Sequence, residues 1–216
     1  MGDVVKATRR YDSSHRREQA ESTRAQILRS AQRRFESDGY VPTTVAAIAK
    51  DAGVAVKTVY LAFETKSGLL RALWGVLLRG ERDVPVASLE TYQRVLREPD
   101  PAAQLRLNAA NARATKERIG SILRVIESAA AQDEEMAAFW QHIETDFRAN
   151  QRVIVESLAD KQALRTELDV DRATDILWTL NHPYTWHLLV GRRGWTPDEF
   201  ESWFGDACIR ELLRTP

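Results

Sequence analysis

Apolar side chains recur at the three-to-four-residue spacing of an α-helix along most of the chain, and no segment reads convincingly as a β-strand. The spacing is clear from Ile27 to Phe35 and again from Phe200 to Leu212. The 216 residues include 10 Gly and 7 Pro, which are too few for the many tight turns of a β-sandwich or barrel. We therefore predict an all-α protein.

Turn-forming residues divide the helical pattern. Asp38-Gly39 is expected to end the first clear helix, Gly53 to separate two short helices, and Pro85 to end the first domain, because proline cannot continue a helix. The resulting organisation is a flexible basic arm over 1–20, a three-helix helix-turn-helix domain over 21–81, and a larger helical domain over 86–216.

Within the larger domain, we expect a broken helix from Leu105, a long helix over about 134–159, and a helix over 171–190 that Pro183 kinks. Asp100-Pro101 has the signature of an N-cap followed by proline. Thr196 begins a capping box with Glu199 three residues later, which predicts the start of the last helix.

The net charge of zero hides an uneven distribution. Residues 1–82 contain 15 Lys and Arg against 9 Asp and Glu, whereas residues 83–216 contain 16 against 22. The first part therefore carries a charge of +6 and favours an anionic partner, most commonly nucleic acid. Five of the cations lie in the expected arm: Lys6, Arg9, Arg10, Arg16 and Arg17.

The segment from Thr44 to Phe63 has the pattern of a helix-turn-helix motif. Its first helix offers small side chains where two short helices must cross, and Gly53 tolerates the positive φ that the turn requires. On its second helix, Lys57, Thr58 and Leu61 point away from the shared core. Such a face can enter the major groove of DNA.

Tyr60 flanks that face and can reach a phosphate group. The pattern alone is equally compatible with an ordinary helical hairpin packed inside an α-protein. The basic arm and the positive first domain favour DNA binding over that alternative.

The motif and its flanks resemble the DNA-binding domain of the TetR family of transcriptional regulators, over about residues 21–81. The resemblance rests on Ile27-Leu28 through Phe35, Gly39-Tyr40, Thr43-Thr44, Ile48-Ala49, Ala52-Gly53-Val54, Thr58-Val59-Tyr60, Phe63 and Lys66-Ser67-Gly68-Leu69-Leu70. It implies a homodimer that binds a palindromic double-stranded DNA operator, as a repressor. A small hydrophobic effector would bind in the helical domain over 86–216 and release the DNA. The single cysteine and the lack of a signal-peptide pattern or membrane span predict a cytoplasmic location.

The resemblance also assigns roles to residues. It implies that Thr44 caps the first helix of the motif and touches a phosphate, and that Tyr60 and Lys66 hold the DNA backbone. Lys57, Thr58 and Leu61 would face the bases. The family often caps the recognition helix with Ser or Thr, and Ala55 in this chain departs from that pattern.

Two other classes of function are the alternatives: a helical interaction module that does not bind DNA, and an enzyme without a recognisable motif. The four histidines lack metal-site spacing, and no phosphate-binding loop or nucleophile motif is present. The single cysteine, Cys208, shares the apolar stripe of Phe200 and Phe204 and is expected to be a packed thiol. We expect no cofactor, no metal and no membrane span.

The larger domain offers candidates for an effector site and for a dimer interface. Polar and tryptophan side chains among apolar helical positions are the effector candidates: Asn108, Asn111, Arg124, Trp140, His142, Trp178 and Asn181. The last two helices carry more apolar residues than one face needs, which predicts a dimer interface through Leu180, Tyr184, Leu188, Phe200, Trp203 and Phe204. The alternative is that these helices only close the core of the monomer.

Overall fold

A computed structural model describes residues 4–80 and 84–214, with side chains from residue 15 onward. The described residues form helices joined by short connections, and Leu164 and Leu213 make an isolated β-bridge. The all-α prediction is therefore confirmed. None of the described helices has both the length and the apolar composition to span a bilayer. Two compact units make up the chain, Met1–Trp74 and Gly75–Pro216, so the division lies inside a helix rather than at Pro85.

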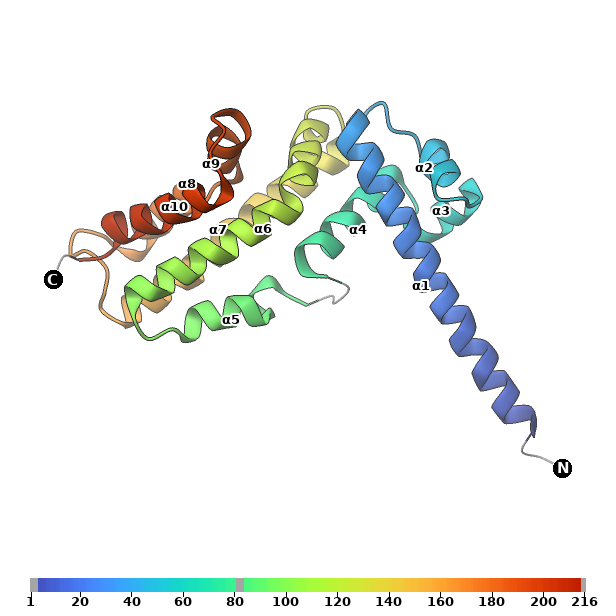
Figure 1. The fold of residues 1–216 in the computed structure, drawn as a ribbon, viewed down its shortest axis with the longest axis horizontal. Coiled ribbons are helices and arrows are strands. Elements are labelled where there is room, and N and C mark those ends of the chain that lie inside the picture. The colour runs from blue at the N-terminus through green and yellow to red at the C-terminus, as the bar shows by residue number, and fades with distance from the viewer. Residues whose placement is uncertain (1–3, 81–83, 215–216) are drawn as a thin grey trace. The chain divides into compact units, whose positions relative to one another are not determined.

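The first unit contains four helices, α1 (Val4–Asp38), α2 (Val45–Asp51), α3 (Val56–Phe63) and the start of α4 (Lys66–Arg79) (Figure 1). Its core packs side chains from all four helices, and the most buried large ones are Ile27, Phe35, Ile48, Val59, Leu69, Leu70 and Leu73. Gly39, at φ +81°, ends the first helix as the sequence predicts.

The predicted irregular arm over residues 1–20 is wrong from Val4 onward, where the backbone is already helical. No Gly or Pro interrupts the chain between Val4 and Asp38, and Arg, Glu, Gln and Ala in this stretch all favour helix. Residues 15–22 of this helix are exposed, and an exposed stretch needs no apolar periodicity because its charged side chains stay in water. Arg17 and Glu21 form an exposed i,i+4 ion pair in it at 3.9 Å.

The second unit continues with six further α-helices and two short helical segments among its described residues. They are η1 (Val86–Ser88), α5 (Glu90–Arg97), α6 (Pro101–Ala130), α7 (Glu134–Asp160), α8 (Val170–Leu180), α9 (Pro183–Trp186), the π-helical η2 (His187–Arg192) and α10 (Pro197–Leu212). Asp100 caps α6 and Thr196 forms the predicted capping box of α10.

Two predictions about these helices are corrected. The broken helix expected from Leu105 is one continuous 30-residue helix, α6, because Gly120 in its interior does not interrupt the helical backbone. Pro183 does not kink a continuing helix but starts a new one, since proline fits the first position of a helix. The His182 ring caps that new helix by accepting from the Tyr184 N–H at 3.2 Å.

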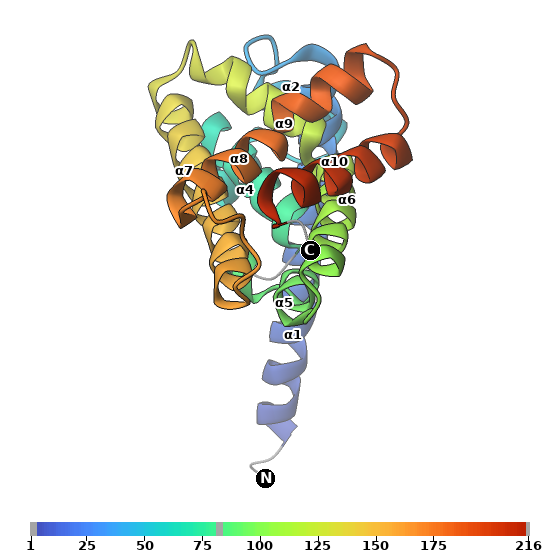
Figure 2. The same ribbon diagram turned by 90° about the vertical axis from the view of Figure 1, so that its left-hand side faces the viewer.

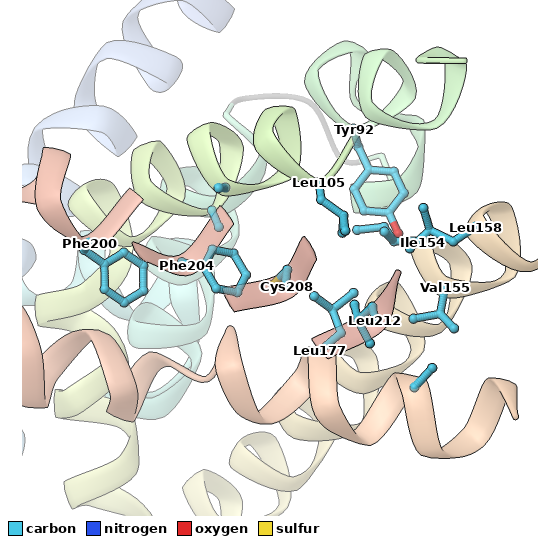
Figure 3. Close-up of a cluster of buried hydrophobic side chains, with 13 residues drawn as sticks. Tyr92, Leu105, Ile154, Val155, Leu158, Leu177, Phe200, Phe204, Cys208 and Leu212 are labelled. Atoms are coloured by element: carbon cyan, nitrogen blue, oxygen red, sulfur yellow. The ribbon is translucent and has the colours of Figure 1, made fainter. Parts of the chain in front are cut away.

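The core of the second unit lies among α6, α7, α8 and α10, which pack side by side (Figures 1 and 2). Figure 3 shows Phe200, Phe204 and Cys208 following one another along α10 within this cluster. Both phenylalanines are 0% exposed. Their assignment to a dimer interface is therefore wrong: their turns of α10 face α6 and bury both rings in the monomer's own core.

Candidate nucleic-acid interface

The predicted helix-turn-helix forms between Thr44 and Phe63. The Thr44 hydroxyl accepts from the Ala47 N–H at 3.1 Å and caps α2. Gly53 has φ +66°, as the turn requires, and the Val54 N–H donates to the Ala49 carbonyl at 3.0 Å. These local interactions fix where α2 ends and where α3 begins.

Helix α3 buries one side and exposes the other. Val59 and Phe63 are buried, whereas Lys57, Tyr60 and Leu61 are exposed, Leu61 at 77%. These three positions are spaced i, i+3 and i+4 and therefore share one face. Thr58 is half-buried at the edge of that face. The Ala55 side chain gives α3 no cap, as expected from the sequence.

Lys66 has a different role from the one that the resemblance implies. Its ammonium group donates to the carbonyls of Tyr40 at 2.9 Å and Thr43 at 3.2 Å, and lies 4.2 Å from the centre of the Tyr40 ring. Lys66 therefore ties the α1–α2 connection to the start of α4. The predicted contact with a DNA phosphate is replaced by this positioning role, because the N–H groups already bond to the protein.

Helix α1 contacts both helices of the helix-turn-helix motif, α2 and α3. Arg34 forms a two-pronged contact with Asp51 at the end of α2, at 2.5 and 3.1 Å. This hydrogen bonding holds the pKa of Asp51 below its usual value. Arg24 donates to the Ala62 carbonyl at 3.1 Å and lies 4.4 Å from the centre of the Phe63 ring, at the end of α3.

A tight connection joins α3 to α4. Glu64 has φ 63° and ψ −53°, and the Thr65 N–H donates across it to the Phe63 carbonyl at 2.7 Å, which is the geometry of a γ-turn. The Thr65 hydroxyl then accepts from the Gly68 N–H at 2.9 Å. A Cβ at Gly68 would collide with the Phe63 carbonyl oxygen, so glycine is needed there.

The seven effector candidates separate by burial. Asn108 and Asn181 are buried, at 4% and 5% exposure, and Trp178 is half-buried with its indole nitrogen enclosed. Arg124 and His142 are exposed, so an enclosed effector-binding role for them is not supported. The turns of α6 and α7 that carry them face solvent. Trp140 and Asn111 are half-buried.

Sequence reasoning missed two members of the buried polar group. Lys116 donates to the Asn181 side-chain oxygen, and the Asn181 amide donates to Gln151 at 3.0 Å. Both missed residues are among the buried polar side chains of the unit. A signal for Lys116 was available, because it continues the apolar stripe of α6 between Ala112 and Ile119.

The remaining dimer candidates lie toward the surface of the second unit. Tyr184 is 50% exposed and Leu188 is 38% exposed, and Leu180 is half-buried. Trp203 is also half-buried, and its ring packs edge-on against Trp195 with the centroids 5.9 Å apart. Each of these four side chains stays partly accessible, although Leu180 and Trp203 also pack against the core, whereas Phe200 and Phe204 are fully buried.

The sequence comparisons agree on the first unit. Residues 27–73 match the family described as "Bacterial regulatory proteins, tetR family". A 57-residue segment is 44% identical to the HTH-type transcriptional regulator TtgR of Pseudomonas putida, and equally to the probable HTH-type transcriptional regulator ArpR of the same species. Each match spans 26% of this chain and 27% of the relative, so it covers about a quarter of those proteins.

The fold as a whole is similar to solved structures. NalD of Pseudomonas aeruginosa, the secondary repressor of the MexAB-OprM multidrug efflux pump, superposes with a TM-score of 0.66 and 22% identity, over 90% of this chain and 98% of NalD. A putative regulator from Saccharomonospora viridis, solved with choline, has a TM-score of 0.69 and 14% identity, over 90% and 100% of the two chains. The relatives named here are described as transcriptional regulators or, for NalD, as a repressor.

Proposed function

The first unit of this chain is the N-terminal domain of the tetR family of bacterial regulatory proteins, and from this premise we propose that the protein is a DNA-binding transcriptional regulator. It acts as a homodimeric repressor on a palindromic operator. A small hydrophobic effector binds in the second unit and releases the DNA by favouring a conformation that fits the operator less well.

One observation carries the proposal: α3 exposes Lys57, Tyr60 and Leu61 on one face. Val59 and Phe63, on its other side, are buried in the core of the first unit. A lysine can donate to guanine in the major groove, and a leucine can contact the methyl group of thymine. The exposed Tyr60 would contact a phosphate through its hydroxyl. Half-buried Thr58 lies at the edge of this face and adds a short-range contact to a base.

Exposed parts of the first unit supply further phosphate contacts. Thr44 lies at the exposed N-terminus of α2, where backbone N–H groups point outward and attract anions. Arg17 is exposed on the N-terminal part of α1. These groups would add affinity without base preference, because phosphates carry no sequence information.

The dimer that the operator requires is assigned to the apolar surface of Leu180, Tyr184, Leu188 and Trp203. A two-fold interface buries the same surface on both chains, and it sets two recognition helices about 34–36 Å apart for successive major grooves. Tyr184→Glu would place a charge in this interface without disturbing the core, since Tyr184 is half-exposed. We expect monomers in sedimentation and loss of operator binding; a dimer that persists at micromolar concentration would move the interface elsewhere.

The alternative function is a helical interaction module that has lost DNA binding. Selection of bound sequences from random DNA with the purified full-length protein separates the two. A regulator enriches a palindromic sequence, whereas an interaction module enriches none.

A matched pair of variants then tests the recognition face. Lys57→Ala should reduce the discrimination between the selected operator and random DNA by about 1–3 kcal/mol. Lys50→Ala removes an exposed cation from α2 instead and should leave base preference unchanged. If Lys57→Ala keeps the base preference of the unaltered protein, α3 does not read the sequence through this face.

A further inference from the structure

The buried polar side chains of the second unit form a chain of hydrogen bonds that all run in one direction. Lys116 of α6 donates to the side-chain oxygen of Asn181, just after α8. Asn181 donates to Gln151 of α7 at 3.0 Å, and Gln151 donates to the Phe147 carbonyl at 3.3 Å. Each side chain donates to the next one along the chain. The side-chain oxygen of Asn181 is therefore the one acceptor that these bonds give to Lys116.

Lys116 lacks a negative partner. Its side chain is 6% exposed, and none of the described carboxylates forms an ion pair with it. Its ammonium nitrogen lies 5.6 and 5.7 Å from the ring centres of Phe200 and Phe204, which offset only part of the cost of burying a charge. Burial lowers the pKa of Lys116 to about 7.

The titratable side chain that interacts with Lys116 is the Cys208 thiol of α10. Burial raises the pKa of that thiol well above its usual value, so the thiol stays neutral and supplies no counter-charge. The other groups that contact the ammonium are an amide oxygen and two aromatic rings. A buried cation with this surrounding is electrostatically incomplete.

On α6 and α8, two further buried donors lack an acceptor among the described residues: the side-chain amide nitrogen of Asn108 and the indole nitrogen of Trp178. Asn108 lies two turns before Lys116 on the same face of α6, and Trp178 lies one turn before Asn181 on α8. Three donors are therefore in surplus on α6 and α8.

We propose that Lys116 and Asn181 bind the head group of the effector, and that the effector is an apolar molecule bearing a carboxylate or a similar anion. The inference rests on the proposed function, of which it names the ligand class. The anion pairs with Lys116 and accepts from the ammonium N–H groups that Asn181 leaves free. The apolar body packs against the aromatic side chains of α10 and α9, where Trp186 and Phe200 already lie edge-to-face with ring centres 4.9 Å apart.

This arrangement should distinguish ligands by the charge of their head group. A carboxylate supplies the missing counter-charge and can accept several hydrogen bonds, whereas a carboxamide of the same shape supplies no charge. A cationic ligand is disfavoured by like-charge repulsion from Lys116. Matched acid and amide probes therefore test the proposal directly.

The chain also offers a matched control lysine. The Lys161 ammonium is partly buried too, but it donates to the Glu98 carbonyl at 2.6 Å and to the Gln104 side-chain oxygen. Lys161 thus donates to two protein acceptors, whereas Lys116 donates to one. Lys116→Gln removes the charge and keeps a donor for Asn181, and Lys116→Met removes both.

The experiment measures binding of 2-naphthoate and decanoate, and of their carboxamides, to the full-length protein by calorimetry and thermal shift. We expect at least one of the two acids to stabilise the unaltered protein and Lys161→Met alike. Its affinity should fall by about 10-fold or more in Lys116→Gln and Lys116→Met. The amides should bind all four proteins equally, and circular dichroism checks that each variant keeps its helices.

Two results would overturn the inference: neither acid binds the unaltered protein, or the acids bind the Lys116 variants as tightly as the unaltered protein. DNA selection with the same preparations keeps the proposed function separate. Operator binding without Lys116-dependent acid binding rejects the ligand class alone. Lys116-dependent acid binding without any selected operator rejects the regulator and keeps the anion site.

Discussion

Each of the two units withdraws a lysine ammonium from water, and they satisfy it to different degrees. In the first unit Lys66 donates to two backbone carbonyls and stacks over Tyr40. In the second unit Lys116 is more deeply buried and has one amide oxygen and two ring faces. A satisfied lysine braces a fixed structure, whereas an unsatisfied one is poised for a partner of opposite charge.

The difference matches what the units are proposed to do. A DNA-reading unit must present α3 in one orientation, and Arg34, Arg24 and Lys66 each hold part of it by bonds to the protein. A ligand-binding unit must respond to a molecule that enters it. The core of the second unit is well packed in its apolar part, but its buried Lys116 ammonium has no counter-charge. Under the proposal, an anionic ligand supplies that charge and so affects the unit.

The apolar part of the second unit carries the largest expected effect on stability. Phe204→Ala should lower the free energy of unfolding by about 3–5 kcal/mol, because the ring is 0% exposed and its removal leaves a cavity. Tyr184→Ala, at a side chain that is 50% exposed, should cost far less. Denaturant unfolding under monomeric conditions measures both. Similar losses would show that Phe204 is not a core residue.

The pH dependence of stability tests the unsatisfied lysine. The pKa of Lys116 is about 7 in the folded protein and near 10.5 in the unfolded chain, so between these values the unfolded state binds more protons. Stability relative to Lys116→Gln should therefore rise from pH 7 to pH 10 and stay constant below pH 7. Paired thermal unfolding of the two proteins measures the difference and cancels other titrations. A flat difference would place Lys116 in contact with water.

Lys66, which has protein acceptors, should instead contribute to stability through its hydrogen bonds. Lys66→Met leaves the carbonyls of Tyr40 and Thr43 without their donor, and we expect a loss of about 1–3 kcal/mol in the free energy of unfolding. Lys57→Met removes an exposed cation from α3 and should change stability by less than about 0.5 kcal/mol. Equal effects of the two substitutions in denaturant unfolding would show that the hydrogen bonds of Lys66 do not stabilise the first unit.

The features that the sequence predicts correctly are those set by a few neighbouring residues. Thr44 caps α2, Gly53 takes positive φ, and Asp100 and Thr196 start α6 and α10, as their local patterns indicate. Each of these depends on bonds within three or four residues, so no knowledge of the tertiary structure is needed.

The features that it misses depend on residues distant in sequence. Lys66 looks like a surface cation until the acceptor 26 positions away is placed beside it, and the partner of Lys116 lies 65 positions away. Phe200 and Phe204 fit an interface as well as a core until α6 is known to cover them. The N-terminal part of α1 was missed for another reason: its sequence carries no apolar period from which a helix could be predicted.

The smallest effect concerns the backbone of the first unit. Glu64 sits at the centre of a γ-turn with φ 63°, a conformation that a side chain makes unfavourable by about 1–3 kcal/mol. Glu64→Gly relieves this strain and also gives the unfolded chain more freedom, which reduces the gain. Glu64→Ala keeps the Cβ and removes only the carboxylate, so it is the matched control. We expect Glu64→Gly to be the more stable of the two by about 1 kcal/mol in denaturant unfolding. Equal stabilities would mean that the turn between α3 and α4 is not strained, and that the recognition helix is set by its Arg24 contact and by the core alone.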